Sequence, residues 1–421
     1  MIKLFLAYLE EQNIPYRITN GYENIADDIT TDNDHDILFQ KRVFKNIEKI
    51  LLSFSKANGF RLVQEYHQGQ FAKNFFLYDP ETKQVLNLDL YGELSRLDVV
   101  ILNEKEVFEK EPFKYDSISI LRPEQEFIQY LIKKIDKEIV SKSSFEKINS
   151  LFLLKKVECK AYLKMFFQNS QTELIDIFET SNYILLQNRL RYFKKDFKNN
   201  PKTGKESLVP KLLRLMKRIV LPTGFTIAFL GPDGSGKSTI IEGLKNRQLP
   251  FRRVDYFHLK PIVKKGGSED SGVVSNPHAS NPYAALKSYG KLVYFIYQYN
   301  SGWLKNIFLL KRKSSLIIFD RYYDDLLVDS KRYRYGGSKF VANIVKFFIP
   351  RPALYFVLTA DVDIIYGRKQ EVSKEELNRQ LNEYSYLVDG KRYLGIDVSK
   401  TPNEIIDEIY NVLMLRMNER Y

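Results

Sequence analysis

Short apolar runs alternate with helical patterns in the C-terminal part of the chain. Each run is continuous, as expected for a strand that is buried on both faces of a sheet. The runs are 227–230, 316–319, 353–358 and 394–398. Apolar positions at helical spacing follow the first run, and a last helix is expected at 402–417. This alternation predicts that residues 222–421 form a doubly wound α/β domain with a parallel sheet.

The first 115 residues have a different pattern. They open with an amphipathic helix, and strand-like segments follow at 60–66, 74–78 and 84–91. This mixture predicts an N-terminal α+β domain over 1–115. Residues 116–221 have apolar positions at helical spacing, which predicts a helical connector between the two domains.

The connector ends in a basic amphipathic segment, 210–221 (PKLLRLMKRIVL). A helix here places Lys211, Arg214 and Arg218 along one side. Two roles fit this pattern. One is peripheral contact with an anionic membrane at its inner face, and the other, which we prefer, is docking of one domain on the next.

Composition narrows the expected location. With 421 residues and 44% hydrophobic content, the chain can bury large cores in two or three domains. Its one cysteine, Cys159, excludes an internal disulfide framework and favours a reducing compartment. The first helix runs into Glu10 and Glu11 without a small-residue cleavage site, and no stretch is long and apolar enough to span a bilayer. We therefore expect a cytoplasmic protein.

The net charge of +13 is unevenly distributed along the chain. It is −5 over residues 1–115, +9 over 116–221 and +9 over 222–421. Such a basic excess fits nucleic acid, an anionic membrane or phosphorylated substrates. The chain has no helix-turn-helix, zinc-finger or recognition-strand signature, so we rank nucleic acid last. The sequence leaves the oligomeric state open.

A complete P-loop follows the first apolar run. The sequence GPDGSGKST fits the pattern Gly231-x-x-x-x-Gly236-Lys237-Ser238. Its glycines let backbone N–H groups turn toward a phosphate chain, Lys237 can reach the β and γ phosphates, and Ser238 can offer its hydroxyl to Mg²⁺. The loop therefore predicts a nucleoside triphosphate and Mg²⁺ as cofactors. The residues expected to contact the nucleotide are Gly231, Gly234, Ser235, Gly236, Lys237, Ser238 and Thr239.

The second apolar run ends in Asp320 and Arg321. A strand that ends in an aspartate is the Walker B arrangement, so Ser238 and Asp320 are the expected Mg²⁺ ligands. The neighbouring Arg321 can pair bidentately with a phosphate. Arg368 and Lys369 follow the third run and a short helix, at the position where a nucleotide kinase has its lid.

Residues 222–421 resemble thymidylate kinase-like P-loop kinases in the GPDGSGKST loop, the Asp320–Arg321 pair and a lid that begins at Arg368. The resemblance implies that ATP with Mg²⁺ is the phosphoryl donor. It also implies that Asp233 lies close to the acceptor, Arg321 holds the acceptor's phosphate, and Arg368 stabilises the transition state. The catalytic residues are then expected to be Lys237, Asp233, Asp320, Arg321 and Arg368. The whole chain looks like bacterial two-domain proteins, often found with surface-polysaccharide genes, in which a nucleotidyltransferase-like domain precedes the kinase.

The N-terminal domain carries a second acidic constellation. Asp34 and Asp36 lie two residues apart, Asp89 lies on a later strand, and Gly21 supplies an upstream turn. Such carboxylates hold two Mg²⁺ ions around a nucleoside triphosphate. The pattern resembles the nucleotidyltransferase superfold, which makes Asp34, Asp36 and Asp89 a candidate second metal site.

Two departures separate this domain from an active transferase. Tyr22 stands where the family has a small residue that makes room for the triphosphate, and His35 replaces the usual apolar residue between the aspartates. The resemblance therefore supports the fold more strongly than the reaction. In a simpler alternative, Asp34 and Asp36 only cap and solvate a junction between a loop and a strand.

The acceptor segment after Arg321 departs from thymidylate kinases, which have a serine-rich, Tyr-Gln sequence there. Here it reads YYDDLLVD, and Arg332 and Arg334 follow. Three functions remain open: a nucleoside monophosphate kinase, a kinase for a sugar hydroxyl of a surface or lipid-linked glycan, and an ATP-gated binding protein without turnover. A sugar acceptor needs a general base and aromatic or carboxylate contacts, for which the sequence offers Asp233, Tyr322, Tyr323 and Asp325. A phosphorylated acceptor would use Arg321.

Overall fold

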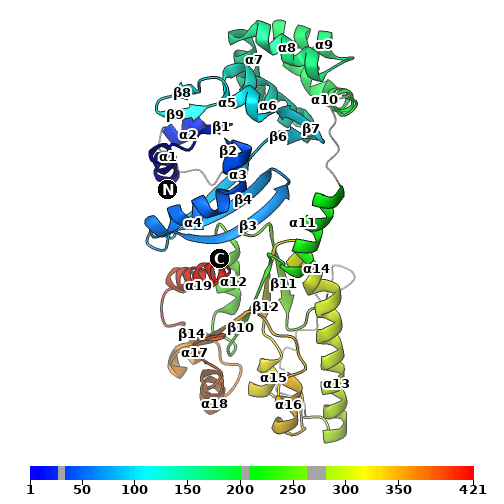
Figure 1. The fold of residues 1–421 in the computed structure, drawn as a ribbon. Helices are drawn as coiled ribbons and strands as arrows, with labels where there is room; N and C mark the ends of the chain where they lie inside the picture. Colours follow the sequence, from blue (N-terminus) through cyan, green and yellow to red (C-terminus); the bar gives the residue numbers. More distant parts are fainter. Residues whose placement is uncertain (27–33, 201–207, 263–280) are drawn as a thin grey trace. The chain divides into compact units, whose positions relative to one another are not determined.

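The computed structural model describes residues 1–26, 34–200, 208–262 and 281–421 (Figure 1). The chain divides into two compact units. One is Met1–Leu215 with Arg420–Tyr421, and the other is Met216–Glu419. Each unit is built around its own sheet, and the P-loop belongs to the second.

The second unit contains a five-stranded sheet in which all neighbouring strands are parallel. Its order is β11-β12-β10-β13-β14. The strands are β10 (Phe225–Leu230), β11 (Arg253–His258), β12 (Ser315–Asp320), β13 (Leu354–Thr359) and β14 (Tyr393–Asp397). The predicted parallel sheet is therefore confirmed. The apolar pattern did not single out β11, because this edge strand is mostly polar and partly exposed.

Helices connect these strands. They are α12 (Lys237–Lys245), α13 (Ala285–Gly302), the π-helical turn η1 (Trp303–Ile307), α14 (Phe308–Arg312), α15 (Asp324–Val328), α16 (Lys339–Lys346), α17 (Val362–Arg368), α18 (Lys374–Ser385) and α19 (Pro402–Asn418). Ala228 and Leu230 of β10 share one core with α13, α15 and α16. Because side chains alternate along a strand, Ile227 and Phe229 face the other side of the sheet. Helices α12 and α19 pack together near β12 and β14 (Figure 1).

The first unit contains a seven-stranded mixed sheet of order β3-β4-β5-β2-β1-β9-β8. Its strands are β1 (Tyr16–Ile18), β2 (His35–Phe39), β3 (Arg61–Gly69), β4 (Ala72–Tyr78), β5 (Val85–Tyr91), β8 (Phe113–Tyr115) and β9 (Ile118–Ile120). Helices α1 (Ile2–Glu11), α2 (Tyr22–Ala26), α3 (Lys41–Lys45), α4 (Ile47–Ala57) and α5 (Glu104–Phe108) accompany it. Strands β2 and β5 are parallel neighbours, and their register places Asp36 opposite Asp89.

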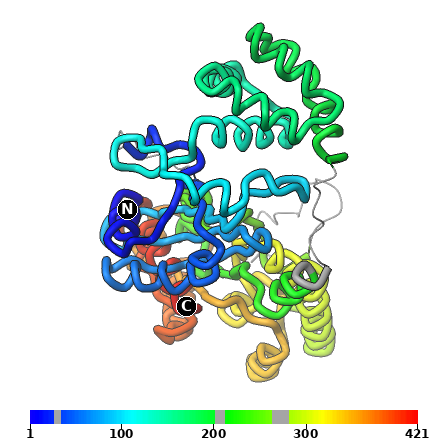
Figure 2. Tube along the Cα trace, turned by 45° about the horizontal axis from the view of Figure 1, so that its top comes forward, coloured from blue at the N-terminus to red at the C-terminus, as the bar shows by residue number. Residues whose placement is uncertain are grey.

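Five helices follow in the same unit (Figure 2). They are α6 (Pro123–Lys137), α7 (Lys142–Leu154), α8 (Lys156–Phe166), α9 (Gln171–Glu179) and α10 (Tyr183–Lys198). Their core includes Phe127 and Phe152, and it also includes Leu94 and Val99 from the small hairpin of β6 (Leu94–Arg96) and β7 (Val99–Leu102). The helices expected as a connector thus share a core with part of the segment 1–115.

Helix α11 (Leu208–Val220) occupies the basic amphipathic segment, as predicted. Leu212, Leu213, Leu215 and Met216 on this helix are exposed. Among the residues that the structure describes, no helix combines the length and apolarity needed to cross a membrane.

Candidate active site

The P-loop joins the end of β10 to α12, and its backbone requires glycine. Gly231, Gly234 and Gly236 have φ angles of +144°, +82° and +84°, which L-residues rarely adopt. A Cβ atom on Gly231 would lie 2.7 Å from the carbonyl oxygen of Leu358. The glycine pattern therefore reflects both backbone conformation and close packing against β13.

Lys237 begins α12 and is buried. Its Nζ donates hydrogen bonds to the carbonyl oxygens of Gly231 (2.9 Å) and Pro232 (2.8 Å) and to Oγ of Ser235 (3.3 Å). Burial, together with the nearby charge of Arg321, lowers the pKa of Lys237 to about 7. The ammonium group is thus poorly neutralised in this pocket, and a phosphate chain would supply the missing negative charge.

Asp320 is the last residue of β12, and its two carboxylate oxygens differ in their hydrogen bonding. Its Oδ2 accepts a hydrogen bond from the Tyr256 hydroxyl at 3.0 Å. Its Oδ1 is buried and has no hydrogen-bond partner among the described residues. Mg²⁺ prefers oxygen ligands and usually takes one or two carboxylates plus substrate phosphates. Asp320 and the Ser238 hydroxyl, which line the same pocket, are a donor set of this kind.

Arg321 is held rigidly at the start of the next loop. Its φ angle is +68°, a conformation that is costly for a non-glycine residue, and its backbone N–H donates to the carbonyl of Phe229 at 2.9 Å. Its guanidinium contacts both carboxylate oxygens of Asp325, at 2.9 and 2.8 Å, and also pairs with Asp233. Such strain is commonly found where a side chain must point into a site.

Asp325 is the anchor of this arginine. It is fully buried and accepts hydrogen bonds from the hydroxyls of Tyr333 (2.8 Å) and Tyr384. Burial alone would raise the pKa of Asp325, but the charge of Arg321 and these hydroxyls hold it below its ordinary value. Asp325 therefore positions Arg321 and is not exposed to an acceptor.

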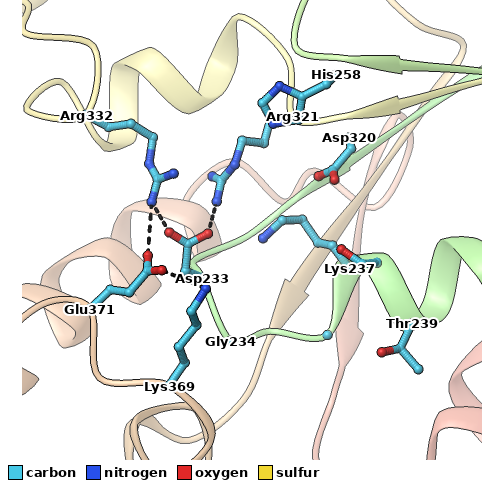
Figure 3. Close-up of a pocket in the computed structure, with 12 residues that line it drawn as sticks. Asp233, Gly234, Lys237, Thr239, His258, Asp320, Arg321, Arg332, Lys369 and Glu371 are labelled. Carbon is cyan, nitrogen blue, oxygen red and sulfur yellow. Dashed lines mark hydrogen bonds and ion pairs between the residues drawn. The ribbon is translucent and has the colours of Figure 1, made fainter. Parts of the chain in front are cut away.

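Alternating charges continue from Asp233 across the pocket (Figure 3). Arg332 pairs with Asp233 and lies 3.7 Å from Glu371, whose other oxygen is 2.6 Å from Nζ of Lys369. Burial would raise the pKa of Asp233, but a hydrogen bond with Glu371 and the charges of Arg321 and Arg332 outweigh it and hold this pKa well below the usual range. Asp233 is thus a fixed anion between two arginines.

These groups line one pocket of about 420 Å³. It is lined by Asp233, Gly234, Gly236, Lys237, Ser238, Thr239, His258, Asp320, Arg321, Arg332, Lys369 and Glu371. Burial lowers the pKa of His258, which favours the neutral imidazole. Four cationic side chains therefore face three carboxylates and one histidine around a space large enough for phosphate groups.

Most predicted residues of the kinase site come together in this pocket. Of the predicted P-loop contacts, Gly231 and Ser235 do not line it but hold Lys237 instead. Arg368 does not line it either: its Nη2 donates to the carbonyl of Val398 at 2.9 Å. The next residue, Lys369, lines the pocket instead.

Tyr322 and Tyr323, which the sequence offered as contacts for a sugar acceptor, do not line the pocket. Both are buried in the core between the sheet and α13. The Tyr322 hydroxyl accepts from Nε1 of Trp303 at 2.8 Å, and the Tyr323 hydroxyl donates to the carbonyl of Ala342 at 2.9 Å. A tyrosine next to a catalytic motif can line the pocket, or it can pack its ring in the core and satisfy its hydroxyl there. The sequence alone does not distinguish these two positions.

Sequence reasoning did not place His258 or Glu371 in the site, and it named Lys369 only as a cation next to Arg368 at the expected lid. His258 ends β11 opposite Asp320, while Lys369 and Glu371 follow α17. Of the two arginines that follow the acceptor segment, Arg332 lines the pocket, whereas Arg334 lies over the Tyr283 ring and does not. The parallel strand order could have located His258, because neighbouring parallel strands end at the same edge of a sheet.

The three N-terminal aspartates also lie near one another. Asp36 accepts hydrogen bonds from the Tyr91 hydroxyl (3.0 Å) and from Nζ of Lys133 (2.7 Å). Asp89 accepts from Asn74 at 2.7 Å, and Asp34 accepts from an asparagine on β5. Burial, together with the charges of Asp36 and Asp34, raises the pKa of Asp89 to about 6, although the Asn74 hydrogen bond opposes this shift.

Lys133 supplies a positive charge to the group formed by Asp34, Asp36 and Asp89. The Lys133 ammonium contacts Asp36 where a cation would otherwise neutralise the aspartates. Gly21, the upstream turn, has a φ of +75°. Within the described parts of the chain, no group of three or more acidic, histidine or cysteine side chains has the arrangement of a metal site. A transferase role for Asp34, Asp36 and Asp89 stays a prediction.

No model of a known protein family matches this sequence, and a search of curated proteins also gives no match. Solved structures do show similarity. A thymidylate kinase from Candida albicans is 17% identical, with a TM-score of 0.34 and coverage of 46% of this chain and 93% of that chain. A thymidylate kinase from Ehrlichia chaffeensis is 19% identical, with a TM-score of 0.32 and coverage of 46% and 100%. Because these values are low, the function proposed below rests on the site.

Proposed function

We propose that residues 222–421 form an ATP- and Mg²⁺-dependent phosphotransferase whose acceptor carries a phosphate group, as in nucleoside monophosphate kinases. The observation that carries this proposal is the arrangement of Arg321, Arg332 and Lys369 in the pocket that also contains Lys237 and Asp320. A donor needs the P-loop, Lys237 and a metal ligand. A second set of cations in the same pocket is suited to a second phosphorylated molecule.

The residues of the chain have separable roles in this proposal. The P-loop backbone and Lys237 bind the donor phosphates, and Ser238 and Asp320 would hold Mg²⁺, which neutralises charge on the transferring group. Arg321 and Arg332 hold the acceptor phosphate, while Asp233 and Asp325 fix the two guanidinium groups in place. In the reaction, the bond from the γ-phosphorus to the bridging oxygen breaks, and a bond to an acceptor phosphate oxygen forms.

A phosphate acceptor also suits the protonation states in the pocket. The second pKa of a phosphate monoester is about 6, so its oxygen is already deprotonated at neutral pH. A sugar hydroxyl instead needs a group that takes its proton. Asp233 is a poor base because its pKa is held low, and the sugar contacts expected from Tyr322, Tyr323 and Asp325 are buried in the core.

A kinase for the hydroxyl of a glycan is the second candidate, and His258 favours it. This imidazole lines the pocket, and burial keeps it neutral and able to accept a proton. An ATP-gated binding protein is less well supported, because a switch has no need for acceptor-side arginines.

Matched acceptor pairs test the proposal. Each nucleoside monophosphate, and each sugar phosphate, is compared with its dephosphorylated form while ADP release from ATP and Mg²⁺ is measured. We expect ADP release with a phosphorylated member and none above background with its partner. Equal turnover of both members, with a His258→Ala variant inactive at every pH, would support the hydroxyl kinase instead.

A further inference from the structure

Helix α13 carries apolar side chains on two opposite sides. One side, which includes Leu292, Phe295 and Tyr299, packs into the core. At 100° per residue, a second stripe lies directly opposite and continues into η1. It consists of Leu286, Val293, Tyr297 and Leu304, which are between 63% and 85% exposed. A surface helix of a globular protein normally has one apolar side, so this outer stripe indicates contact with something else.

Helix α16 repeats the arrangement. Its buried residues are Ala342 and Val345, whereas Phe340 is 73% and Phe347 76% exposed. Helices α13 and α16 are in contact (Figure 1). Nδ2 of Asn300, which lies between Tyr297 and Leu304 along α13 and η1, donates to the carbonyl of the exposed Phe348 at 2.9 Å. The end of the α16 segment therefore adjoins the outer stripe, and we call the two exposed sets together the outer face.

Cations predominate among the charged residues of the segments that form this face. Residues 281–319 contain six Lys and Arg and no Asp or Glu, and the same is true of residues 330–360. Lys287 and Lys305 are exposed on one flank of the stripe, and the Arg351 guanidinium lies 5.5 Å from the Phe347 ring centroid. Among the described residues, Glu383 pairs with Lys339 and Asp324 pairs with Lys346, both on the α16 side of the face.

The outer face combines exposed apolar side chains with cations, and we compared how well three kinds of partner match both features. A second copy of the chain meeting this face across a two-fold axis would bring cations opposite cations. A nucleic acid backbone would match the cations but leave the phenylalanines and leucines exposed. An anionic bilayer offers acyl chains for the apolar stripe and lipid phosphates for the lysines and arginines. Exposed tyrosines also suit the interfacial region of a membrane.

We propose that α13, η1 and α16 form a docking face for the surface of an anionic phospholipid membrane. The stripe inserts between headgroups, and Lys287, Lys305 and Arg351 contact lipid phosphates. This surface is separate from the residues that line the pocket. It does not depend on the acceptor, so it can hold or fail independently of the proposed kinase activity.

The single tryptophan of the chain is a built-in reporter. Trp303 begins η1 and precedes Leu304 of the stripe. The full-length protein is mixed with vesicles of phosphatidylglycerol and phosphatidylcholine, or of phosphatidylcholine alone, and bromine-labelled lipids are used to quench tryptophan fluorescence. We expect co-sedimentation and quenching with the anionic vesicles, and at least tenfold weaker binding to the neutral ones and at high salt.

Charge substitutions localise the contact. The pair Val293→Asp and Tyr297→Asp should lower vesicle binding at least tenfold and abolish quenching, while ADP release stays unchanged. Leu154→Asp with Val157→Asp is the matched control, because these apolar residues are exposed on α7 and α8 of the other unit. The control should bind vesicles like the wild type.

Three results would overturn the proposal. They are equal binding of the stripe variant and the wild type, equal binding to neutral and anionic vesicles, and unquenched Trp303 in vesicle-bound protein. Light scattering supplies the alternative outcome. If the wild type is a dimer that does not bind vesicles and the stripe variant is a monomer, the outer face is a self-association surface.

Discussion

Arg321 shows how contacts within the chain fix the position of a single side chain in the site. Its backbone is held at a φ of +68°, its Nη1 donates to buried Asp325, and its Nη2 donates to Asp233. Fixing these groups in advance lowers the entropy lost on binding. The same holds for Arg332, which Asp329 and Asp233 orient toward the pocket.

Arg332 and Arg334 form a matched pair for testing the acceptor side. Arg332 lines the pocket, whereas Nε of Arg334 donates to the carbonyl of Asn281 at 3.1 Å, outside the pocket lining. Arg332→Ala should raise KM for a phosphorylated acceptor about 10- to 100-fold, since a hydrogen bond to a charged group is worth about 1.5–3 kcal/mol. KM for ATP should change little. Steady-state kinetics in which Arg334→Ala has the larger effect would contradict this assignment.

The raised pKa of Asp89 predicts how the stability of the protein depends on pH. Its pKa is about 6 in the folded protein and 3.8 in the reference state. Between these two pH values the folded state binds more protons than the unfolded state, so the free energy of unfolding falls as the pH rises. The stability that Asp89 contributes by binding its proton is complete below pH 3.8 and is lost as the pH rises through 6. Asp89→Asn, which has the same shape, should match the wild type near pH 4 and exceed it by roughly 1–2 kcal/mol at pH 7. Urea denaturation at both pH values measures this, and equal stability at pH 7 would refute it.

Some helices, strands and loops of the site could be predicted from the sequence, and others could not. The glycine pattern and the apolar runs predicted β10, the P-loop, α12 and β12, because these residues are consecutive and their spacing is fixed by backbone geometry. Lys369 and Glu371 reach the pocket from the segment after α17, and Arg332 from the loop after α15. Their positions depend on how loops pack, which residue spacing does not encode. The misplacement of Tyr322 has a similar cause, since its burial depends on α13, a helix distant in the sequence.

The P-loop conformation predicts the effect of adding one methyl group. Gly231→Ala would place a Cβ 2.7 Å from the Leu358 carbonyl oxygen at a φ of +144°. We expect a loss of roughly 1–3 kcal/mol in stability from backbone strain and weaker ATP binding. Gly290→Ala on α13 is the control, because its Cβ meets nothing within 4 Å and should stabilise the helix slightly. Thermal unfolding and nucleotide titration measure both variants, and wild-type ATP affinity in Gly231→Ala would contradict the expectation.

At the scale of the whole molecule, each unit is organised around a sheet, but the predicted limits of the first domain cut through a core. Leu94, Val99 and Ile101 pack with Phe127 and other residues of α6 to α10. The apolar pattern identified these helices correctly and could not show that they bury the β6–β7 hairpin, because that contact joins distant segments. The helical part is therefore a structural part of the first unit.

A fragment experiment follows from this shared core. Residues 1–115 alone would expose Leu94, Val99 and Ile101, whereas residues 1–200 would keep them buried. We expect a cooperative thermal transition by circular dichroism for 1–200 and aggregation or no cooperative transition for 1–115. Cooperative unfolding of the shorter fragment, at a temperature close to that of the longer one, would show that the helices are dispensable.

We propose that the second unit transfers a phosphoryl group from ATP to a phosphate oxygen of the acceptor. The most direct measurement is ³¹P NMR of the product formed from ATP, Mg²⁺ and a mixture of phosphorylated and unphosphorylated acceptors. We expect, in addition to the ADP formed from ATP, a second new phosphoanhydride, recognised by the coupling between its phosphorus nuclei. A new uncoupled phosphomonoester signal would show transfer to a hydroxyl group and would contradict the claim.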